Sequence, residues 1–217
     1  MPAAERLEEI RSGIAAASKV AGRDPSAVTL IAVSKTRGVA EIEALATAGQ
    51  RDFGESRVQE ALDKWPDLLA ANSGLRLHCI GRLQSNKAAD AVRLFDSIHS
   101  VDRRSLLDSL AKEAEKAGRT PSVYVQVNIG DEPQKGGCPI AEVGQLVAAV
   151  RSTELRLAGL MCIPPLDLEP SPFFALLAKL ADEHGVSGLS MGMSADYKTA
   201  VMLGATAVRV GTALFEA

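Results

Sequence analysis

The sequence predicts an α/β protein folded as a single (β/α)8 TIM barrel, and three observations lead to this prediction. Short apolar, β-branched segments alternate along the chain with longer segments of helical periodicity that are rich in Ala, Leu, Glu and Lys. Eight strand-like segments can be counted with a helical segment in each of the seven gaps, as in successive parallel βαβ units. The length of 217 residues suits a closed barrel, for which roughly 200–250 residues is usual. No Pro- or Ser-rich linker divides the chain, so residues 1–217 are expected to form one domain.

The first element is expected to be an extra N-terminal helix over about residues 3–22. Its apolar positions recur at spacings of three and four: Leu7, Ile10, Ile14 and Ala17. Gly22 offers a stop signal for this helix. The segment VTLIAVSK that follows, residues 28–35, is rich in β-branched and apolar residues and is expected to be the first strand.

The remaining elements follow from the same two periodicities. The later strands are expected at 51–53, 75–81, 95–102, 122–130, 155–164, 186–194 and 206–212. The later helices are expected at 39–48, within the segment that begins at 54, and at 84–92, 103–117, 140–152, 171–184 and 195–203. No helix is expected after the last strand, and the N-terminal helix is expected to take that place in the ring.

The composition and the N-terminal sequence argue against a nucleic-acid-binding, a membrane-spanning or a secreted protein. There are 24 Lys and Arg against 27 Asp and Glu, a net charge of −3, which lacks the basic footprint of a nucleic-acid-binding protein. No apolar run approaches the roughly 18–20 residues that span a bilayer. The N-terminal MPAAERLEEI lacks the basic-then-apolar order of a secretory signal. A cytoplasmic protein that binds neither nucleic acid nor membrane is expected.

The cysteines and histidines give no support for a metal site. They are Cys79, Cys138, Cys162, His78, His99 and His184, and they show no CxxC, HxxxH or HExxH spacing. Cys79 and Cys162 lie inside apolar runs and are expected to be buried thiols. His78 and His99 flank apolar positions and are expected to be packing or capping residues rather than ligands.

The binding site of such a barrel lies at the carboxyl ends of its strands. Lys35 follows the apolar run LIAV of the first strand, so its side chain is expected to start inside the barrel mouth. Loss of solvation there lowers the pKa of a lysine, and the neutral amine can then form a Schiff base with a carbonyl compound. The alternative is a lysine that reaches to the rim or pairs with Glu55 or Asp102.

The loops after the seventh and eighth strands predict a phosphate site. GMS runs into the helix expected from about residue 195, with Ser194 in the position of an N-cap, and RVGT closes the last strand. Small residues such as Gly211 and Thr212 allow close approach to a ligand, and barrels commonly bind phosphate at these loops. The alternative is an ordinary glycine-containing turn with a capping serine.

A lysine that can form a Schiff base with a carbonyl group, opposite a phosphate site, suggests a phosphorylated aldehyde as the ligand. Two classes of protein bind one in this way, a sugar-phosphate aldolase and a pyridoxal phosphate (PLP) protein. Arg209 lies two residues before Gly211, so strand alternation directs both to the same face of the barrel. A guanidinium there would face the pyridine nitrogen of PLP or pair with a phosphate or carboxylate, and spacing alone favours neither.

Seven blocks of sequence resemble the YggS/PROSC family of PLP-binding proteins. They occur in the family's order and cover the chain from about residue 28 to 215. The blocks are AVSKT (32–36), FGES-VQE (53–60), IG-LQSNK (80–87), QVNIGDE--K-G (126–137), GLM-IP (159–164), LSMGMSAD (189–196) and VRVGTALF (208–215).

The resemblance implies a fold type III PLP barrel, like the N-terminal domain of alanine racemase, and a role in PLP homeostasis. It implies that Lys35 holds PLP as a Schiff base and that Arg209 faces the pyridine nitrogen. The other cofactor-binding positions that it implies are Met193, Ser194, Gly211 and Thr212 around the phosphate, with Ser190, Asn86 and Lys87 behind them or at the rim. The chain departs from the family at Ser56, a cofactor-binding position where Asn is usual, at Arg57 and Arg82, and at Glu216 in place of Gly.

The same residues favour a carrier over an enzyme. An arginine beside the pyridine nitrogen opposes the protonation that makes PLP a strong electron sink. Racemisation also needs acid–base groups on both faces of the substrate, and neither Tyr124 nor Tyr197 is placed to supply the second. We therefore expect a monomeric carrier that holds PLP for apo PLP-dependent enzymes, with no catalytic and no metal-binding residues. The alternatives are a PLP-dependent amino-acid racemase or related fold type III enzyme, and a lysine aldolase without cofactor.

Overall fold

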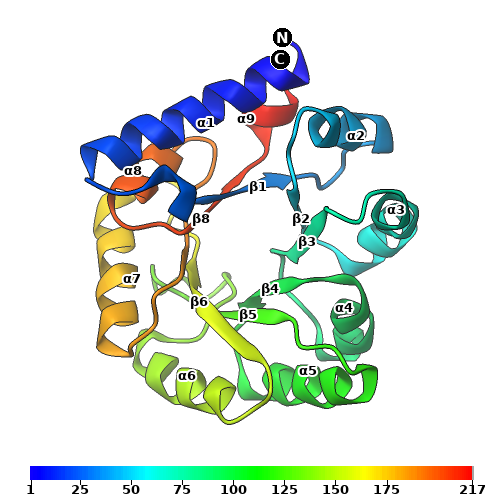
Figure 1. Cartoon of the computed structure of the whole chain (residues 1–217). Helices are drawn as coiled ribbons and strands as arrows, with labels where there is room; N and C mark the ends of the chain where they lie inside the picture. The colour runs from blue at the N-terminus through cyan, green and yellow to red at the C-terminus, as the bar shows by residue number, and fades with distance from the viewer. Residues whose placement is uncertain (217) are drawn as a thin grey trace.

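The computed structural model describes residues 1–216 and contains a closed barrel of parallel strands. The strands follow one another around the barrel in sequence order, and the last pairs with the first, Ile31 lying beside Arg209 (Figure 1). The strands are β1 (Thr29–Val33), β2 (Asp52–Glu55), β3 (Arg76–Cys79), β4 (Ser97–Val101), β5 (Ser122–Val127), β6 (Arg156–Cys162), β7 (Leu189–Ser190) and β8 (Ala207–Val210). The predicted fold class is confirmed.

Helices surround the barrel, one after each strand (Figure 1). The α-helices are α1 (Ala3–Val20), α2 (Val39–Thr47), α3 (Val58–Ala71), α4 (Ala88–Leu94), α5 (Arg104–Ala117), α6 (Val143–Arg151), α7 (Ser171–Glu183), α8 (Tyr197–Met202) and α9 (Thr212–Phe215). Three 3₁₀ turns precede β1, α4 and α6: η1 (Pro25–Ala27), η2 (Ser85–Lys87) and η3 (Ile140–Glu142). None of the helices in residues 1–216 is long and apolar enough to cross a membrane.

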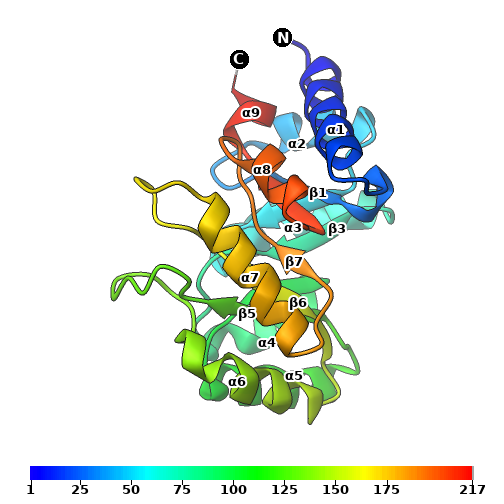
Figure 2. The ribbon, with the colours of Figure 1, turned by 90° about the vertical axis from the view of Figure 1, so that its left-hand side faces the viewer.

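The N-terminal helix closes the ring, but it does so together with a short helix that the sequence analysis missed. The four predicted apolar positions of α1 are all buried, and the chain turns at Gly22 with a φ of 65°. α1 packs against both α8 and α9 (Figures 1 and 2). The expectation that no helix follows the last strand was therefore wrong. One helical turn buries both Leu214 and Phe215, which an extended segment would place on opposite faces.

Seven of the eight strands are shorter than predicted, and the seventh is the shortest, whereas the second spans Asp52–Glu55 instead of 51–53. The seventh was expected over 186–194 but spans only Leu189–Ser190. Gly188 limits it on one side, because its backbone lies so close to Ala158 that a Cβ would be 1.9 Å from the carbonyl oxygen. Gly192 limits it on the other side with a φ of 94°, which no strand residue adopts. The residues after β7 therefore form a loop at the carboxyl end of the barrel.

The carboxyl ends of the strands carry the longer loops. Figure 2 shows the loops that follow β5 and β6 extending from this end of the barrel. The first strand also ends early, at Val33, so that Ser34 is outside the ladder and Lys35 and Thr36 form a turn. Thr36 has a positive φ of 63°, an uncommon conformation for a threonine. The turn that carries Lys35 is thus held in one defined shape.

Candidate functional site

Lys35 lies in the turn after β1, and its side chain is exposed. It was expected to start inside the barrel mouth and to lose solvation there. That expectation was wrong, because β1 ends two residues earlier than predicted and the turn carries Lys35 onto the rim. The alternative of a pair between Lys35 and Glu55 or Asp102 does not hold either, since Glu55 pairs with Lys64 and Asp102 with Arg103.

A buried polar cluster behind the turn fixes the position of Lys35. The carboxylate of Glu55 is fully buried and accepts hydrogen bonds from the Ser34 hydroxyl at 2.8 Å and from the indole N–H of Trp65 at 2.9 Å. Lys64 neutralises this carboxylate at 2.7 Å and also donates to the carbonyl of Ser34 at 2.9 Å. The backbone N–H of Ser34 also donates to the carbonyl of Gly54 at 3.0 Å, so its N–H, carbonyl and hydroxyl are all tied to neighbouring elements. Lys35 extends from a rigid base although its own side chain is free in solvent.

A cavity of about 380 Å³ lies next to Lys35, within the range of roughly 300–1,000 Å³ that is usual for small-molecule sites. Its lining brings together six of the eight predicted cofactor-binding residues: Lys35, Met193, Ser194, Arg209, Gly211 and Thr212. They come from the ends of β1, β7 and β8. Val33, Thr36, Arg37, Ala195 and Glu216 complete the lining.

The loop after β7 presents free backbone donors to this cavity. Ser194 was expected to be the N-cap of α8, but that position belongs to Asp196. The carboxylate of Asp196 accepts a hydrogen bond from the N–H of Met193 at 2.6 Å, so this N–H is not available to a ligand. The N–H groups of Ser194 and Ala195 have no hydrogen-bond partner within residues 1–216. Donors of this kind are what a phosphate group binds.

Gly192 allows this loop to pack closely on α8. Its φ is 94°, and a Cβ at this position would lie 2.5 Å from the Cβ of Ala200. Any other residue would push the loop away from the helix, and with it the N–H groups of the next residues. The glycine of the GMS motif therefore shapes the loop but lies outside the lining of the cavity.

Arg209 lies on β8 with its side chain pointing into the barrel, and it is only 4% exposed. Its guanidinium donates to the Ser190 hydroxyl at 2.7 Å and to the carbonyl of Cys162 at 2.9 Å. Burial lowers the pKa of Arg209 from its usual value, but the group stays a cation because an arginine pKa starts above about 12. Ser190 does not line the cavity. It lies behind Arg209, as predicted for a supporting residue.

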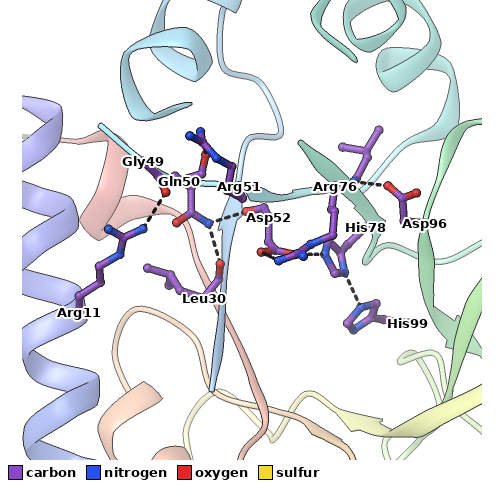
Figure 3. A network of polar contacts seen from close by, with 11 residues as sticks. Arg11, Leu30, Gly49, Gln50, Arg51, Asp52, Arg76, His78, Asp96 and His99 are labelled. Atoms are coloured by element: carbon purple, nitrogen blue, oxygen red, sulfur yellow. Dashed lines mark hydrogen bonds and ion pairs between the residues drawn. The ribbon is translucent and has the colours of Figure 1, made fainter. Parts of the chain in front are cut away.

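Two histidines and an aspartate continue this contact across the barrel, and the sequence analysis missed them as a group. His99 lies 2.8 Å from the Ser190 hydroxyl, His78 lies 3.1 Å from His99, and Asp52 lies 2.9 Å from His78. Figure 3 shows the part of this chain from His99 to Asp52. The packed state expected for both histidines is confirmed, but their mutual contact depends on the register of β2, β3 and β4. No sequence spacing reports it.

The carboxylate of Asp52 makes a contribution to stability that depends on pH. Burial alone would raise its pKa, but hydrogen bonds from His78 and Arg76 outweigh burial and hold the pKa below its usual value. The contribution of this group to the free energy of unfolding is therefore complete above about pH 4 and is lost as the pH falls further. We expect Asp52→Asn to lower the free energy of unfolding at pH 7, with a deficit that shrinks below about pH 4. Urea unfolding of both proteins from pH 7 to pH 3 measures this, and a deficit that does not change with pH would contradict it.

Arg37 and Glu216 form the rim of the cavity. Their side chains are paired, and the guanidinium of Arg37 lies 5.5 Å from the ring centroid of Phe215. Glu216 is the one acidic residue in the lining, and this pair places a cation directly beside it. The position where the resembled family has glycine thus carries an ion pair between the end of α9 and the loop before α2.

Four of the positions named from the resemblance lie outside the lining: Ser190, described above, and Ser56, Asn86 and Lys87. Ser56 is half-buried after β2, where its carbonyl would collide with a Cβ at Gly81, and its role in cofactor binding stays a prediction. Asn86 and Lys87 belong to η2 and do not line the cavity.

The three cysteines are all free and buried, as expected for Cys79 and Cys162. Burial raises the pKa of each thiol to about 12. A thiol with such a pKa is protonated at neutral pH and is a poor nucleophile. Lys35 is therefore the nucleophile that this end of the barrel offers among the residues described.

The lining fits PLP in its chemistry. Two unpaired N–H groups and the hydroxyls of Ser194 and Thr212 are donors for a phosphate, Lys35 is an amine for an aldehyde, and Arg209 is a fixed cation between them. The lining would suit a dianionic aldehyde and would suit a cationic ligand poorly, because the one side-chain carboxylate that lines it within residues 1–216 is already paired.

Comparisons with known proteins identify relatives over nearly the full length of the chain. The family model described as "Alanine racemase, N-terminal domain" matches residues 6–217. The pyridoxal phosphate homeostasis protein of Pseudomonas aeruginosa is 42% identical over 221 residues, which cover 99% of this chain and 95% of the relative. Its counterpart in Escherichia coli K12 is 38% identical, with 99% and 96% of the two chains covered.

Solved structures give the same result. PipY of Synechococcus elongatus PCC7942, a COG0325 family member, is 40% identical, and its structures without and with PLP superpose with TM-scores of 0.86 and 0.85 over 98% of this chain and 99% of PipY. Alanine racemase of Clostridium difficile is 14% identical with a TM-score of 0.74, and the match covers 97% of this chain but 56% of the racemase. That likeness shows the fold alone. The identities over nearly the full length of the other relatives show that the chain belongs to the alanine racemase N-terminal domain family and, within it, to the pyridoxal phosphate homeostasis proteins.

Proposed function

We propose that this protein binds PLP at the carboxyl end of its barrel and holds it for use elsewhere in the cell. The observation that carries the proposal is the convergence of Lys35, Arg209 and the two loops after β7 and β8 around one cavity of about 380 Å³. Bound there, PLP supplies an aldehyde that reacts reversibly with amines. The solved PLP complex of PipY, a relative of 40% identity, supports the same ligand for this chain.

Different residues of the lining bind the phosphate, the aldehyde and the ring of PLP. The N–H groups of Ser194 and Ala195 and the hydroxyl of Thr212 bind the phosphate. Lys35 provides the amine for a Schiff base, and its exposure at the rim keeps that bond accessible to exchange with other amines. Arg209 lines the cavity as a buried cation, which would oppose a proton on the nitrogen of a pyridine ring bound there.

A carrier fits this lining better than an amino-acid racemase does. Racemisation needs acid–base groups on both faces of the substrate. Among residues 1–216 the lining holds one amine, Lys35, and one carboxylate, Glu216, which is paired with Arg37. Tyr124 lines a different cavity, together with Asp52 and Arg76, and Tyr197 is buried in α8. A second group suited to the opposite face is missing from this part of the chain.

The partners and state of the protein are part of the same proposal. We propose a cytoplasmic monomer that exchanges PLP with apo PLP-dependent enzymes. The alanine racemase that shares the fold extends well beyond the matched region, which covers 56% of it. The exposed rim around Lys35 leaves the amine open to an incoming protein or substrate.

The experiment that tests the proposal is a visible absorbance spectrum of the purified protein after incubation with PLP. It is followed by borohydride reduction and peptide mass mapping. We expect a visible band that is lost on reduction and a pyridoxyl group on the peptide that contains Lys35. A protein that stays colourless and unmodified would contradict the proposal, and retro-aldol cleavage without PLP would then favour the aldolase alternative. Racemisation of alanine by the loaded protein would favour an enzyme over a carrier.

A further inference from the structure

Five side chains form one continuous chain of hydrogen bonds through the interior of the barrel. It runs from Arg209 on β8 through Ser190 on β7, His99 on β4 and His78 on β3 to Asp52 at the amino-terminal end of β2. The successive distances are 2.7, 2.8, 3.1 and 2.9 Å. Ser190 and His99 are fully buried, so water cannot replace any contact in the middle of the chain.

One set of hydrogen-bond directions satisfies every group in this chain. A guanidinium has only donors, so the Ser190 oxygen accepts from Arg209, and the Ser190 O–H finds an acceptor within the chain only if it donates to Nδ1 of His99. His99 then carries its proton on Nε2 and donates it to Nδ1 of His78. His78 carries its proton on Nε2 and donates it to Oδ1 of Asp52. All five groups are satisfied only in this arrangement, with both imidazoles neutral.

A proton added to either imidazole would break the arrangement. It would place the N–H groups of the two imidazoles against each other, or an N–H against the Ser190 O–H, so that at least one hydrogen bond of the chain would be lost or reversed. Burial and the neighbouring Arg209 cation also lower the pKa of His99 well below its usual value. The ring of Tyr124 stacks on His99 at 4.2 Å between centroids with an interplanar angle of 20°, which prevents the imidazole from tilting out of line.

We propose that Ser190, His99, His78 and Asp52 act as a positioning chain that holds the Arg209 guanidinium toward the ligand cavity, with Asp52 as the fixed acceptor at the opposite end of the barrel. The inference rests on the proposed function, because it assigns Arg209 to the PLP ring. No carboxylate lies within ion-pair distance of Arg209 among residues 1–216. Asp52 closes the chain with a carboxylate that Arg76 also clamps through two contacts of 2.7 and 2.6 Å.

The first test needs no cofactor. Protein labelled with ¹⁵N at histidine contains three imidazoles, and His184, which lies outside the chain of contacts, serves as the internal reference. Long-range ¹H–¹⁵N correlation spectra at pH 7 report the tautomer of each ring. We expect His78 and His99 to be neutral with the proton on Nε2. A proton on Nδ1 of either ring, or a charged ring, would overturn the proposed chain.

The second test removes one link at a time and measures PLP binding. Ser190→Ala takes the acceptor away from Arg209, and Asp52→Asn removes the charge at the end of the chain while keeping an acceptor oxygen. Ser97→Ala is the matched control, because its hydroxyl is also buried on β4 but has no hydrogen-bond partner within residues 1–216. We expect the dissociation constant for PLP to rise about tenfold in Ser190→Ala and about threefold in Asp52→Asn, and to change less than about twofold in Ser97→Ala.

Spectra separate a positioning role from a merely structural one. In Ser190→Ala we expect the Nδ1 resonance of His99 to shift in the unloaded protein and the visible band to shift in the loaded protein, while Ser97→Ala changes neither. Equal PLP affinity and equal spectra in Ser190→Ala and Ser97→Ala would overturn the proposal. Wild-type protein that binds no PLP would instead contradict the proposed function, and the tautomers of His78 and His99 would still decide whether the hydrogen-bonded chain exists.

Discussion

Lys35→Ala is expected to abolish the visible absorbance of the protein incubated with PLP and to remove the site of borohydride labelling. The reason is that the lining holds one amine, and a Schiff base needs it. Some PLP is expected to stay bound without a covalent bond, because Ser194, Thr212 and Arg209 are untouched. Absorbance spectra and equilibrium dialysis measure the covalent and the total binding separately.

The matched control for this substitution is Lys179→Ala. Lys179 is an exposed lysine on α7 that does not line the cavity and pairs weakly with Glu183 at 3.6 Å. Its replacement is expected to leave the absorbance and the labelled peptide unchanged. Lys35→Ala protein that still shows the wild-type band would place the covalent bond on another lysine. The polar cluster around Glu55 lies behind Lys35 and does not include its side chain, so folding is expected to be retained.

The double substitution Ser194→Ala with Thr212→Val is expected to weaken PLP binding by about 3–6 kcal/mol, since a hydrogen bond to a charged group contributes about 1.5–3 kcal/mol. That corresponds to roughly 10²- to 10⁴-fold in the dissociation constant. Both hydroxyls line the cavity, and they come from the two loops predicted to bind phosphate. Inorganic phosphate as a competitor gives a second measurement, because it should protect the wild-type site and have little effect on the variant.

Ser109→Ala on the outside of α5 is a suitable control for the loss of a hydroxyl, since its side chain bonds only to the carbonyl of Ser105. The single variants show whether the two losses add. An affinity within threefold of wild type in the double variant would mean that the phosphate is bound elsewhere. Lys35 and Arg209 would then be the remaining links between this cavity and PLP.

The loops of the site were predictable because each depends on residues that are adjacent in the sequence. Gly192-Met193-Ser194 and Gly211-Thr212 follow strands whose order around a barrel is known once the barrel is recognised. Their convergence with Lys35 follows from parallel strands that end at the same edge. Two local details of these loops differ from the prediction. Asp196 rather than Ser194 occupies the N-cap position, and Lys35 is carried onto the rim by a turn that begins one residue after β1 ends.

The sequence by itself determined the (β/α)8 barrel, the place of Lys35, Arg209 and the phosphate loops at its carboxyl end, and the family, because periodicity and motif order are local properties. The tertiary structure alone decided the contacts among Asp52, His78, His99 and Ser190, which lie on four different strands. Their side chains meet because barrel closure and strand register set which inward residues share a level. Closure of the barrel also determines that α9 packs against α1, because the pairing of β1 with β8 brings the two ends of the chain together.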